Sequence, residues 1–227
     1  MKLQRLLATS ALILWVSNPA TALPIVVPFI NEIHYDNQGT DRNEFVEIAG
    51  SVQSLLGYSL VLYNGGDGRS YRTIPLSIAI PDEGNGFGAV ALAVNGLQNG
   101  PDGIALVDSL DQVLDWISYE GQLLARNGPA QGMLSQVLPV LQLPATAAGL
   151  SLQRIGIGAA AADFGWAGPL ANSPGIINAG QRFVVDRLSV DAPNALLLLV
   201  TGLLLVCTGR YCNALNCRRR AVSTGSV

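Results

Sequence analysis

The chain has 227 residues, of which 49% are hydrophobic and only 13% are charged, and its mean hydropathy is +0.36. Soluble domains carry about 25% charged residues and disordered chains carry few apolar ones, so this composition excludes an intrinsically disordered protein. A formal net charge of −3 excludes a protein that holds nucleic acid through a generally basic surface.

Residues 1–22 have the pattern of a secretory signal peptide. A positively charged start precedes the apolar stretch 6–16, and Ala20 and Ala22 stand where an Ala-x-Ala cleavage site requires small residues. We predict cleavage by signal peptidase after Ala22; the alternative is an uncleaved anchor. A membrane-spanning helix needs about 20 residues, so this stretch is short for a span. The body of the protein is therefore expected outside the cytoplasm.

The body, residues 23–191, is predicted to be one all-β domain with its core at about 28–183. It holds 22 of the 25 glycines of the chain, many in Asn-Gly and Asp-Gly pairs that suit tight hairpins. Short runs of β-branched and aromatic residues between these turns, without a convincing helix, indicate an antiparallel β-sandwich or barrel. Residues 125–149 are expected to form a long loop. The strands are expected at 29–33, 44–49, 58–63, 70–74, 88–94, 104–108, 113–119 and 150–155.

The charge of the body differs from that of the whole chain. All 16 acidic residues but only seven arginines lie in 23–191, so this part carries a net charge of −9. Contacts to nucleic acid phosphates depend on basic side chains. Direct nucleic-acid binding is therefore not expected.

Acidic and amide side chains gather around one loop of the body. Hard oxygen ligands on a loop suit calcium, although the spacing is not that of an EF-hand. We place a candidate calcium site at Asp36, Asn37, Asp41 and Glu44; the alternative is a solvated hairpin loop. Strand alternation puts Phe45 and Glu47 on one face, and Glu44, Val46 and Ile48 on the other. The whole group comprises Glu32, Asp36, Asn37, Asp41, Glu44 and Glu47.

The body lacks the common sequence motifs of catalytic sites. His34 is the one histidine of the chain, which excludes a metal site built on several histidines. No Gly-x-Ser-x-Gly nucleophile elbow is present, and His34 is expected to be structural rather than catalytic. The glycine-rich residues 84–88 lead into a strand and not into a helix, so they are expected to form a hairpin turn rather than a phosphate loop.

The C-terminal residues 192–227 have the pattern of a membrane anchor. The apolar stretch 195–209 is followed by Arg218, Arg219 and Arg220, and the positive-inside rule places these arginines in the cytoplasm. We predict a transmembrane helix in the inner membrane; the alternative is a buried helix that closes the fold. The three cysteines of the chain lie in or after this stretch, so the body cannot form disulfides.

The same tail resembles the PEP-CTERM sorting segment of Gram-negative bacteria. A short polar motif, an apolar stretch and an arginine cluster follow one another in the order typical of that family. The motif here is Asp191, Ala192 and Pro193, so only the second proline of Pro-Glu-Pro is present. The resemblance implies processing by an exosortase, with release or attachment of the body at the cell surface.

The body resembles the bacterial lamin tail domain over about residues 28–183. The resemblance implies an immunoglobulin-like β-sandwich and an exported or surface-attached protein, often joined to extracellular nucleases or other hydrolases. It brings no agreed catalytic residues. The matching segments, in order, are 29–37, 44–48, 57–65, 98–108, 118–121, 128–133, 149–153, 163–166, 174–175, 178 and 180–181.

These observations predict an exported, non-catalytic binding or structural module, without a cofactor other than calcium. Its ligand would be an extracellular protein or polysaccharide. The alternatives are a calcium-dependent extracellular hydrolase that uses the acidic group, and an accessory domain of an extracellular nuclease system. Fold alone does not choose between these functions.

Overall fold

The computed structural model describes residues 25–184 of the chain. The predicted signal peptide, its cleavage site and the predicted membrane tail therefore lie outside the described residues. The strands are β1 (Phe29–His34), β2 (Phe45–Ser51), β3 (Gln53–Ser54), β4 (Ser59–Asn64), β5 (Ser70–Pro75), β6 (Ala79–Ile80), β7 (Phe87–Ala93), β8 (Asp102–Val107), β9 (Val113–Tyr119), β10 (Gln136–Val137), β11 (Leu150–Gly158), β12 (Gly165–Ala171) and β13 (Gln181–Phe183).

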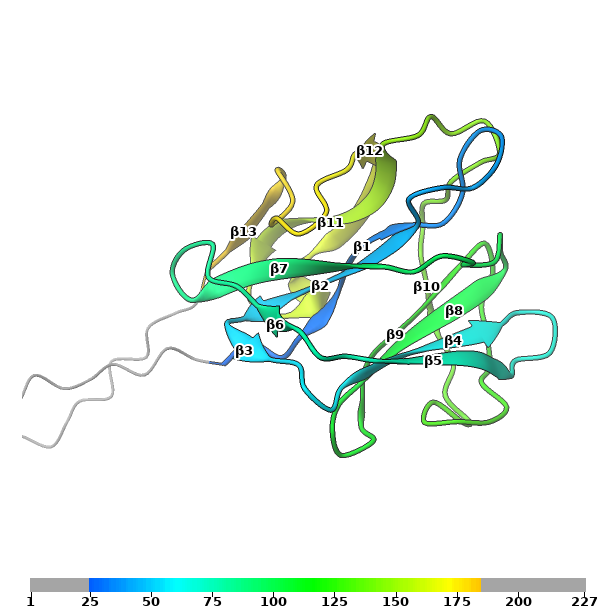
Figure 1. Ribbon diagram of the computed structural model, residues 1–227, viewed down its shortest axis with the longest axis horizontal. Coiled ribbons are helices and arrows are strands. Elements are labelled where there is room, and N and C mark those ends of the chain that lie inside the picture. The colour runs from blue at the N-terminus through cyan, green and yellow to red at the C-terminus, as the bar shows by residue number, and fades with distance from the viewer. Residues whose placement is uncertain (1–24, 185–227) are drawn as a thin grey trace, which may run out of the picture. The chain divides into compact units, whose positions relative to one another are not determined.

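The strands form two main sheets that face each other (Figure 1). The first sheet has the order β12-β11-β1-β2-β7, with β13 also paired to β11, and the second has the order β10-β9-β8-β4-β5. A small additional sheet joins β3 to β6. Pairing is antiparallel except between β9 and β10 and between β11 and β13, which are parallel. The predicted all-β class and its mainly antiparallel sheets are thus confirmed.

All eight strands expected from the sequence are present, with shifts of up to three residues at their ends. The expected long loop at 125–149 contains the two-residue strand β10. The sequence did not predict the two-residue strands β3 and β6, nor β12 and β13. The glycine, proline and alanine content of β12 is unusual for a strand, and β13 is only three residues long. The single helical element described is a short 3-10 turn at Ala161–Asp163. Among residues 25–184, no helix has the length and apolarity needed to cross a membrane.

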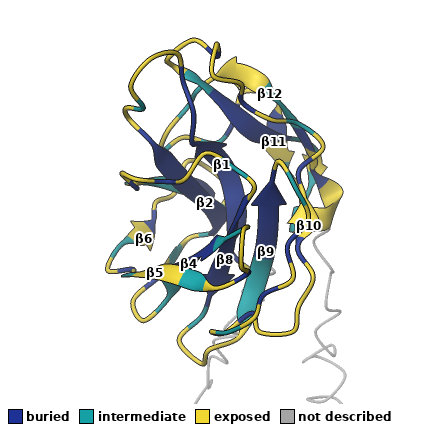
Figure 2. Cartoon of the chain, turned by 90° about the vertical axis from the view of Figure 1, so that its right-hand side faces the viewer, coloured by how far each residue is buried: buried dark blue, intermediate teal, exposed yellow. Residues whose placement is uncertain are grey.

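The main core lies between the two sheets, where strand alternation directs apolar side chains from both. Ile30 and Ile48 come from the first sheet, and Leu60, Ile104 and Ile117 from the second. Figure 2 shows that β8, most of β9, β1 and β2 are buried, whereas β5 and β12 are largely exposed. Burial of this apolar surface is the main stabilising contribution to the fold.

The outer face of the second sheet is covered by residues 121–135, which we call the apolar cover. Leu123, Ala125 and Ala130 of the cover pack with Tyr63 and Trp116, which are themselves buried side chains of the second sheet. The hydrogen bonds of the cover involve hydroxyl, side-chain amide, indole and backbone groups. The backbone N–H of Ala130, for example, donates to the Tyr63 hydroxyl at 3.1 Å.

The outer face of the first sheet is covered by residues 172–180, which join β12 to β13 (Figure 1) and which we call the polar strap. Ser173, Gly175 and Ile177 are half-buried, whereas Pro174 and Ile176 between them are exposed. This alternation means that every second residue of the strap faces the sheet. The residues that it faces include two glutamates.

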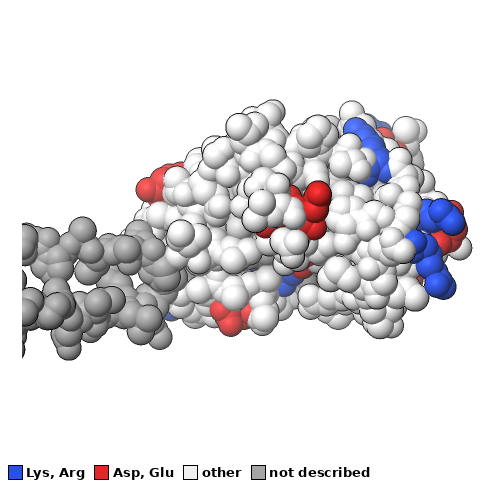
Figure 3. All heavy atoms as spheres, turned by 90° about the horizontal axis from the view of Figure 1, so that it is seen from below, with Lys and Arg blue, Asp and Glu red and all other residues white. Residues whose placement is uncertain are grey.

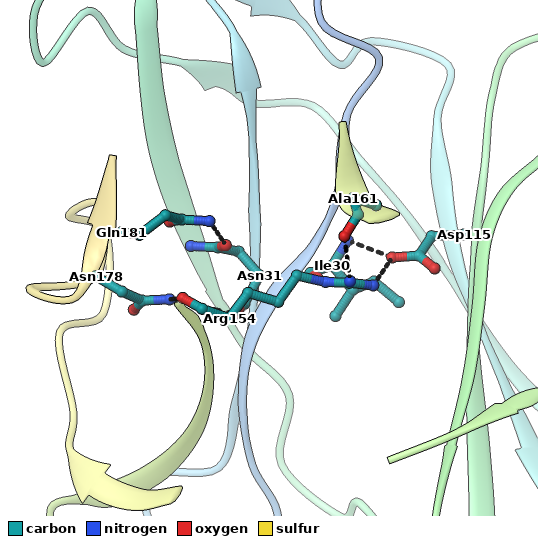
Figure 4. Close-up of polar contacts among 7 residues, drawn as sticks. All are labelled: Ile30, Asn31, Asp115, Arg154, Ala161, Asn178 and Gln181. Carbon is teal, nitrogen blue, oxygen red and sulfur yellow. Dashed lines mark hydrogen bonds and ion pairs between the residues drawn. The ribbon is translucent and has the colours of Figure 1, made fainter. Parts of the chain in front are cut away.

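A buried ion pair links the two sheets at one end (Figure 4). Arg154 of β11 donates to Asp115 of β9 at 3.1 Å and to the carbonyls of Ile30 and Ala161 at 2.9 and 2.7 Å. The guanidinium also lies 4.8 Å from the ring centre of Trp166. Because all of these partners are fixed by strands or by the 3-10 turn, the arginine holds the sheets in one relative position.

Candidate functional site

The six acidic and amide residues predicted around residues 32–47 do not form one cluster. Glu32 and Glu47 lie on the outer face of the first sheet, under the polar strap. The four calcium candidates lie at or beside the loop that joins β1 to β2. The structure thus separates a buried carboxylate pair from a loop, and each is described in turn.

Glu32 and Glu47 stand directly opposite each other on the antiparallel pair β1–β2. Opposite residues of such a pair point to the same face and have neighbouring side chains. Both side chains are fully buried. The predicted alternation of β2 is confirmed, because Val46 and Ile48 join the core between the sheets and Glu47 does not. A β-bulge between Ile30 and Glu32 sets the register that opposes the two glutamates.

The polar strap donates backbone hydrogen bonds to three glutamates in succession. The N–H of Ser173 donates to Glu32 at 3.0 Å, and the N–H of Gly175 donates to Glu47 at 2.6 Å. The N–H of Ile177 donates at 2.9 Å to Glu83, an exposed residue of the turn before β7. The backbone at residues 173, 175 and 177 is therefore attached in turn to β1, to β2 and to the turn before β7.

Uncharged side chains complete the hydrogen bonding of this pair. Asn31 donates to Glu47 at 2.9 Å. Glu32 accepts from the hydroxyl of Ser151, from Gln153 at 3.3 Å and from the hydroxyl of Ser173 at 3.0 Å. Buried carboxylates without such donors would be very unfavourable. The donors therefore explain how two glutamates are accommodated inside the fold.

The carboxylate pair lies in surroundings that disfavour ionisation. Burial raises the pKa of Glu47 from 4.5 to about 8, and the neighbouring negative charge of Glu32 adds to the shift, while the hydrogen bonds from Asn31 and from the Gly175 N–H oppose it. Among residues 25–184 the one ion pair joins Arg154 to Asp115, so no arginine of this part of the chain pairs with Glu32 or Glu47. The raised pKa therefore favours the protonated form of Glu47 at neutral pH.

Further polar side chains attach the strap and β13 to the same sheet (Figure 4). Asn178 donates to the carbonyl of Arg154 at 3.0 Å, and Gln181 donates to the side-chain oxygen of Asn31 at 2.7 Å. Asn178 also accepts from the hydroxyl of Ser173 at 2.9 Å. Asn31 thus contacts both Glu47 and Gln181, which joins the carboxylate pair to the end of the described chain.

The loop between β1 and β2 is held by its own side chains. The amide group of Asn37 donates to the carbonyls of Gln38 and Thr40, both at 3.1 Å, and its oxygen accepts from the backbone N–H of Arg42 at 3.0 Å. Asp41 accepts from the backbone N–H of Asn37 at 3.4 Å. The Asn37 oxygen is therefore already engaged within the loop.

The two remaining calcium candidates are buried. Burial and the nearby charge of Asp41 raise the pKa of Asp36. Glu44 accepts from the backbone N–H of Gly96, and its other oxygen is buried without a hydrogen-bond partner among the described residues; burial raises its pKa as well. Within residues 25–184, no three His, Cys, Asp or Glu side chains lie together so as to hold a metal ion. Calcium binding by this loop stays a prediction.

His34 occupies a structural position. Its Nδ1 lies 2.9 Å from the side-chain nitrogen of Gln142, and its Nε2 lies 3.2 Å from the carbonyl of Arg42. Since the Gln142 nitrogen donates, Nδ1 accepts and the proton resides on Nε2. Gln142 also accepts from the backbone N–H of Tyr35 at 2.7 Å. His34 thus helps to attach the long segment before β11 to β1, as a structural histidine does.

Part of the surface is apolar and uncharged. Figure 3 shows a face on which charged side chains are few. A groove of about 480 Å³ lies beside β1 and includes Val27 and Ala161 in its lining. The segment 124–143 carries several exposed large apolar side chains, which are Leu124, Met133, Leu134, Val137, Leu141 and Leu143. These side chains lie within 20 residues of sequence, and exposed apolar side chains that form a patch are typical of interaction sites.

Sequence reasoning found the two central glutamates but not their partners. Glu83, Ser173 and Gly175 lie in turns and in a segment without hydrophobic periodicity. One signal in the sequence does point to such partners. Each of the two apolar strands 29–34 and 45–51 contains a single glutamate, and a buried carboxylate needs hydrogen-bond donors from elsewhere in the chain.

Comparison of the chain with protein-family models, curated proteins and solved structures gives no match. The sorting and anchoring residues Asp191, Ala192, Pro193, Arg218, Arg219 and Arg220, and the cleavage residues Ala20 and Ala22, lie outside the described residues. Their roles stay predictions.

Proposed function

We propose that this chain is an exported, non-catalytic binding or structural module with an immunoglobulin-like β-sandwich of the lamin tail type. The resemblance of segments such as 29–37 and 44–48 to that family supports the proposal, as does the all-β arrangement of two facing sheets. A signal peptide with cleavage at Ala22 would export the body, and the tail from residue 192 would hold it at the inner membrane or present it to an exosortase.

One observation carries the non-catalytic part of the proposal. The ionisable side chains that could perform acid–base chemistry are occupied by hydrogen bonds that hold the fold together. Glu32 and Glu47 attach the strap, and His34 attaches the segment around Gln142. A general acid or base has to reach the proton that it transfers, and fully buried glutamates under a strap do not reach a substrate.

The exposed apolar side chains of 124–143 are the surface that we propose for ligand binding. They belong to the apolar cover, to the edge strand β10, which is paired on one side only, and to the segment that follows it. An extracellular protein would bury these side chains, and a polysaccharide would use them as flat apolar contacts. The negative charge of the body disfavours nucleic acid as the ligand.

The test uses the full chain expressed with its own termini. After cell fractionation, mass spectrometry of the ends should give an N-terminus at Leu23 in the exported fraction. A C-terminus near Pro193 indicates sorting, and an intact Val227 indicates simple anchoring. An intact Met1 in the cytoplasmic fraction would overturn the proposal of export.

Catalysis is tested on the same material with nucleic acid, phosphoester and glycan substrates. We expect no hydrolysis. Hydrolysis that is lost in His34→Ala but kept in Asp108→Asn, an exposed turn variant, would contradict the non-catalytic proposal.

A further inference from the structure

The polar strap crosses the first sheet on a row of three carboxylates. Ser173, Gly175 and Ile177 donate to Glu32, Glu47 and Glu83 over 3.0, 2.6 and 2.9 Å. Two of these carboxylates are fully buried and belong to neighbouring strands. The strap therefore depends on acceptors whose charge depends on pH.

The groups that face Glu47 carry no positive charge. Glu32 faces it from β1, and Glu83 faces it from the turn before β7; both are acidic. The strap residues 172–180 have no ionisable side chain. Arg154 of β11 directs its guanidinium to Asp115, and His34 stands opposite Phe45 rather than Glu47. Full ionisation would therefore place two or three negative charges together without compensation.

We propose that Glu47, with Glu32 and Glu83 beside it, forms a proton-dependent latch, which holds the strap on the first sheet while Glu47 keeps a proton and releases the strap when that proton is lost. The strap lies between Glu47 and the solvent. When the strap leaves, water reaches the carboxylates and stabilises their charged forms, so the ionised group favours the open state.

The released segment would be local. The main core between the sheets draws its buried side chains from residues 30–166, and the strap contributes none. Ile177 and Phe183 pack at the edge of a separate small cluster around Phe29. Opening therefore exposes little apolar surface, and the two sheets stay together.

Hydrogen–deuterium exchange of the full chain, followed by mass spectrometry between pH 5 and pH 9, tests the latch. After correction for intrinsic exchange, we expect the protection of amides in 172–180 to fall by up to tenfold per pH unit between about pH 5 and pH 8, and to level off above the pKa of Glu47 near 8. The apolar cover, 121–135, serves as the internal reference and should keep its protection. Constant protection of the strap, or an equal loss in both segments, would overturn the proposal.

Variants assign the effect to the carboxylates. Glu47→Gln keeps an oxygen acceptor but cannot ionise, so the amides of the strap should stay protected from exchange at pH 9. Asp108→Asn is the matched control, because Asp108 also accepts two backbone N–H groups in an exposed turn, from Leu110 and Gln112. An unchanged transition in Glu47→Gln would overturn the proposal, and so would loss of the transition in Asp108→Asn.

A second variant keeps the test decisive if Glu47→Gln does not fold. Glu83→Gln lies at the exposed rim and removes one negative charge while it keeps an acceptor for Ile177. With less repulsion the closed strap tolerates an ionised Glu47 better, so the loss of protection between pH 5 and pH 8 should be smaller than in the wild type and should level off at a lower pH. An equal or larger loss would contradict the latch.

Discussion

The outer faces of the two sheets are both covered by a returning segment of chain, but the contacts that hold these covers differ in kind. The apolar cover packs Leu123 and Ala130 against Trp116 and Tyr63. The polar strap is attached by hydrogen bonds to carboxylates, of which Glu47 has a pKa raised to about 8. The comparison teaches that one domain can combine a cover that is insensitive to pH with one that responds to it.

The largest expected effect concerns the apolar cover. Trp116→Ala removes a buried ring whose centre lies 4.8 Å from that of Tyr63. We expect a loss of about 3–5 kcal/mol in the free energy of unfolding, as is usual for a buried aromatic residue. Urea denaturation at pH 5 and at pH 9 should give the same loss. Leu134→Ala, at an exposed site of the cover, is the control and should change stability by less than about 0.5 kcal/mol.

A smaller loss is expected on the other face. Glu32→Ala leaves the donors of Ser151, Gln153 and Ser173 without their acceptor. An unsatisfied buried donor costs about 1–3 kcal/mol, so stability should fall within this range and strap amides should exchange faster. Urea denaturation and hydrogen exchange measure the two effects. Unchanged strap exchange would show that Glu32 does not hold the strap.

The wild-type protein should lose stability as the pH rises from 5 to 8. Glu47 keeps its proton up to about pH 8 when folded but has an ordinary pKa of 4.5, so between these values the folded state binds more protons. The free energy of unfolding then falls by at most about 1.4 kcal/mol per pH unit. Denaturation at several pH values gives the slope. Glu47→Gln should flatten this slope, and an equal slope in that variant would assign the effect to other groups.

The smallest expected effect concerns calcium binding. It tests whether the loop at the end of the first sheet binds the ion through Asp36, Asn37, Asp41 and Glu44. Calcium at ten times its Kd would stabilise the fold by about 1.4 kcal/mol, which corresponds to an increase in Tm of roughly 3–6 °C. Thermal unfolding with calcium and with chelator measures it. A Tm that does not change would remove the hypothesis, and Asp41→Asn should abolish any increase.

The sequence predicted the strands better than the contacts that join them. Runs such as 58–63 and 113–119 can be predicted as strands because they contain β-branched and aromatic residues between turns. β12 was not predicted because its sequence, Gly-Trp-Ala-Gly-Pro-Leu-Ala, has low strand propensity. The strand forms because it pairs with β11. Tertiary pairing in this case outweighed local preference.

The candidate site was predictable only in part, for a related reason. Alternation placed Glu47 on the face opposite Val46, and the structure agrees. Glu32 and Glu47 lie opposite each other only because of a bulge in β1. The contact between Glu47 and Gly175 joins residues that are 128 positions apart in the sequence. Local patterns carry no information about register shifts or about contacts at such separation.

The parallel pairing of β13 with β11 has a mechanical consequence. A pulling force applied beyond Val184 acts first on β13, which is three residues long, and then on the strap. Neither contributes to the core between the sheets, so both should detach while the two sheets stay intact. Residues 172–184, when extended, add roughly 45 Å of length at about 3.3–3.6 Å per residue. The domain thus carries an extensible spacer folded onto its own surface.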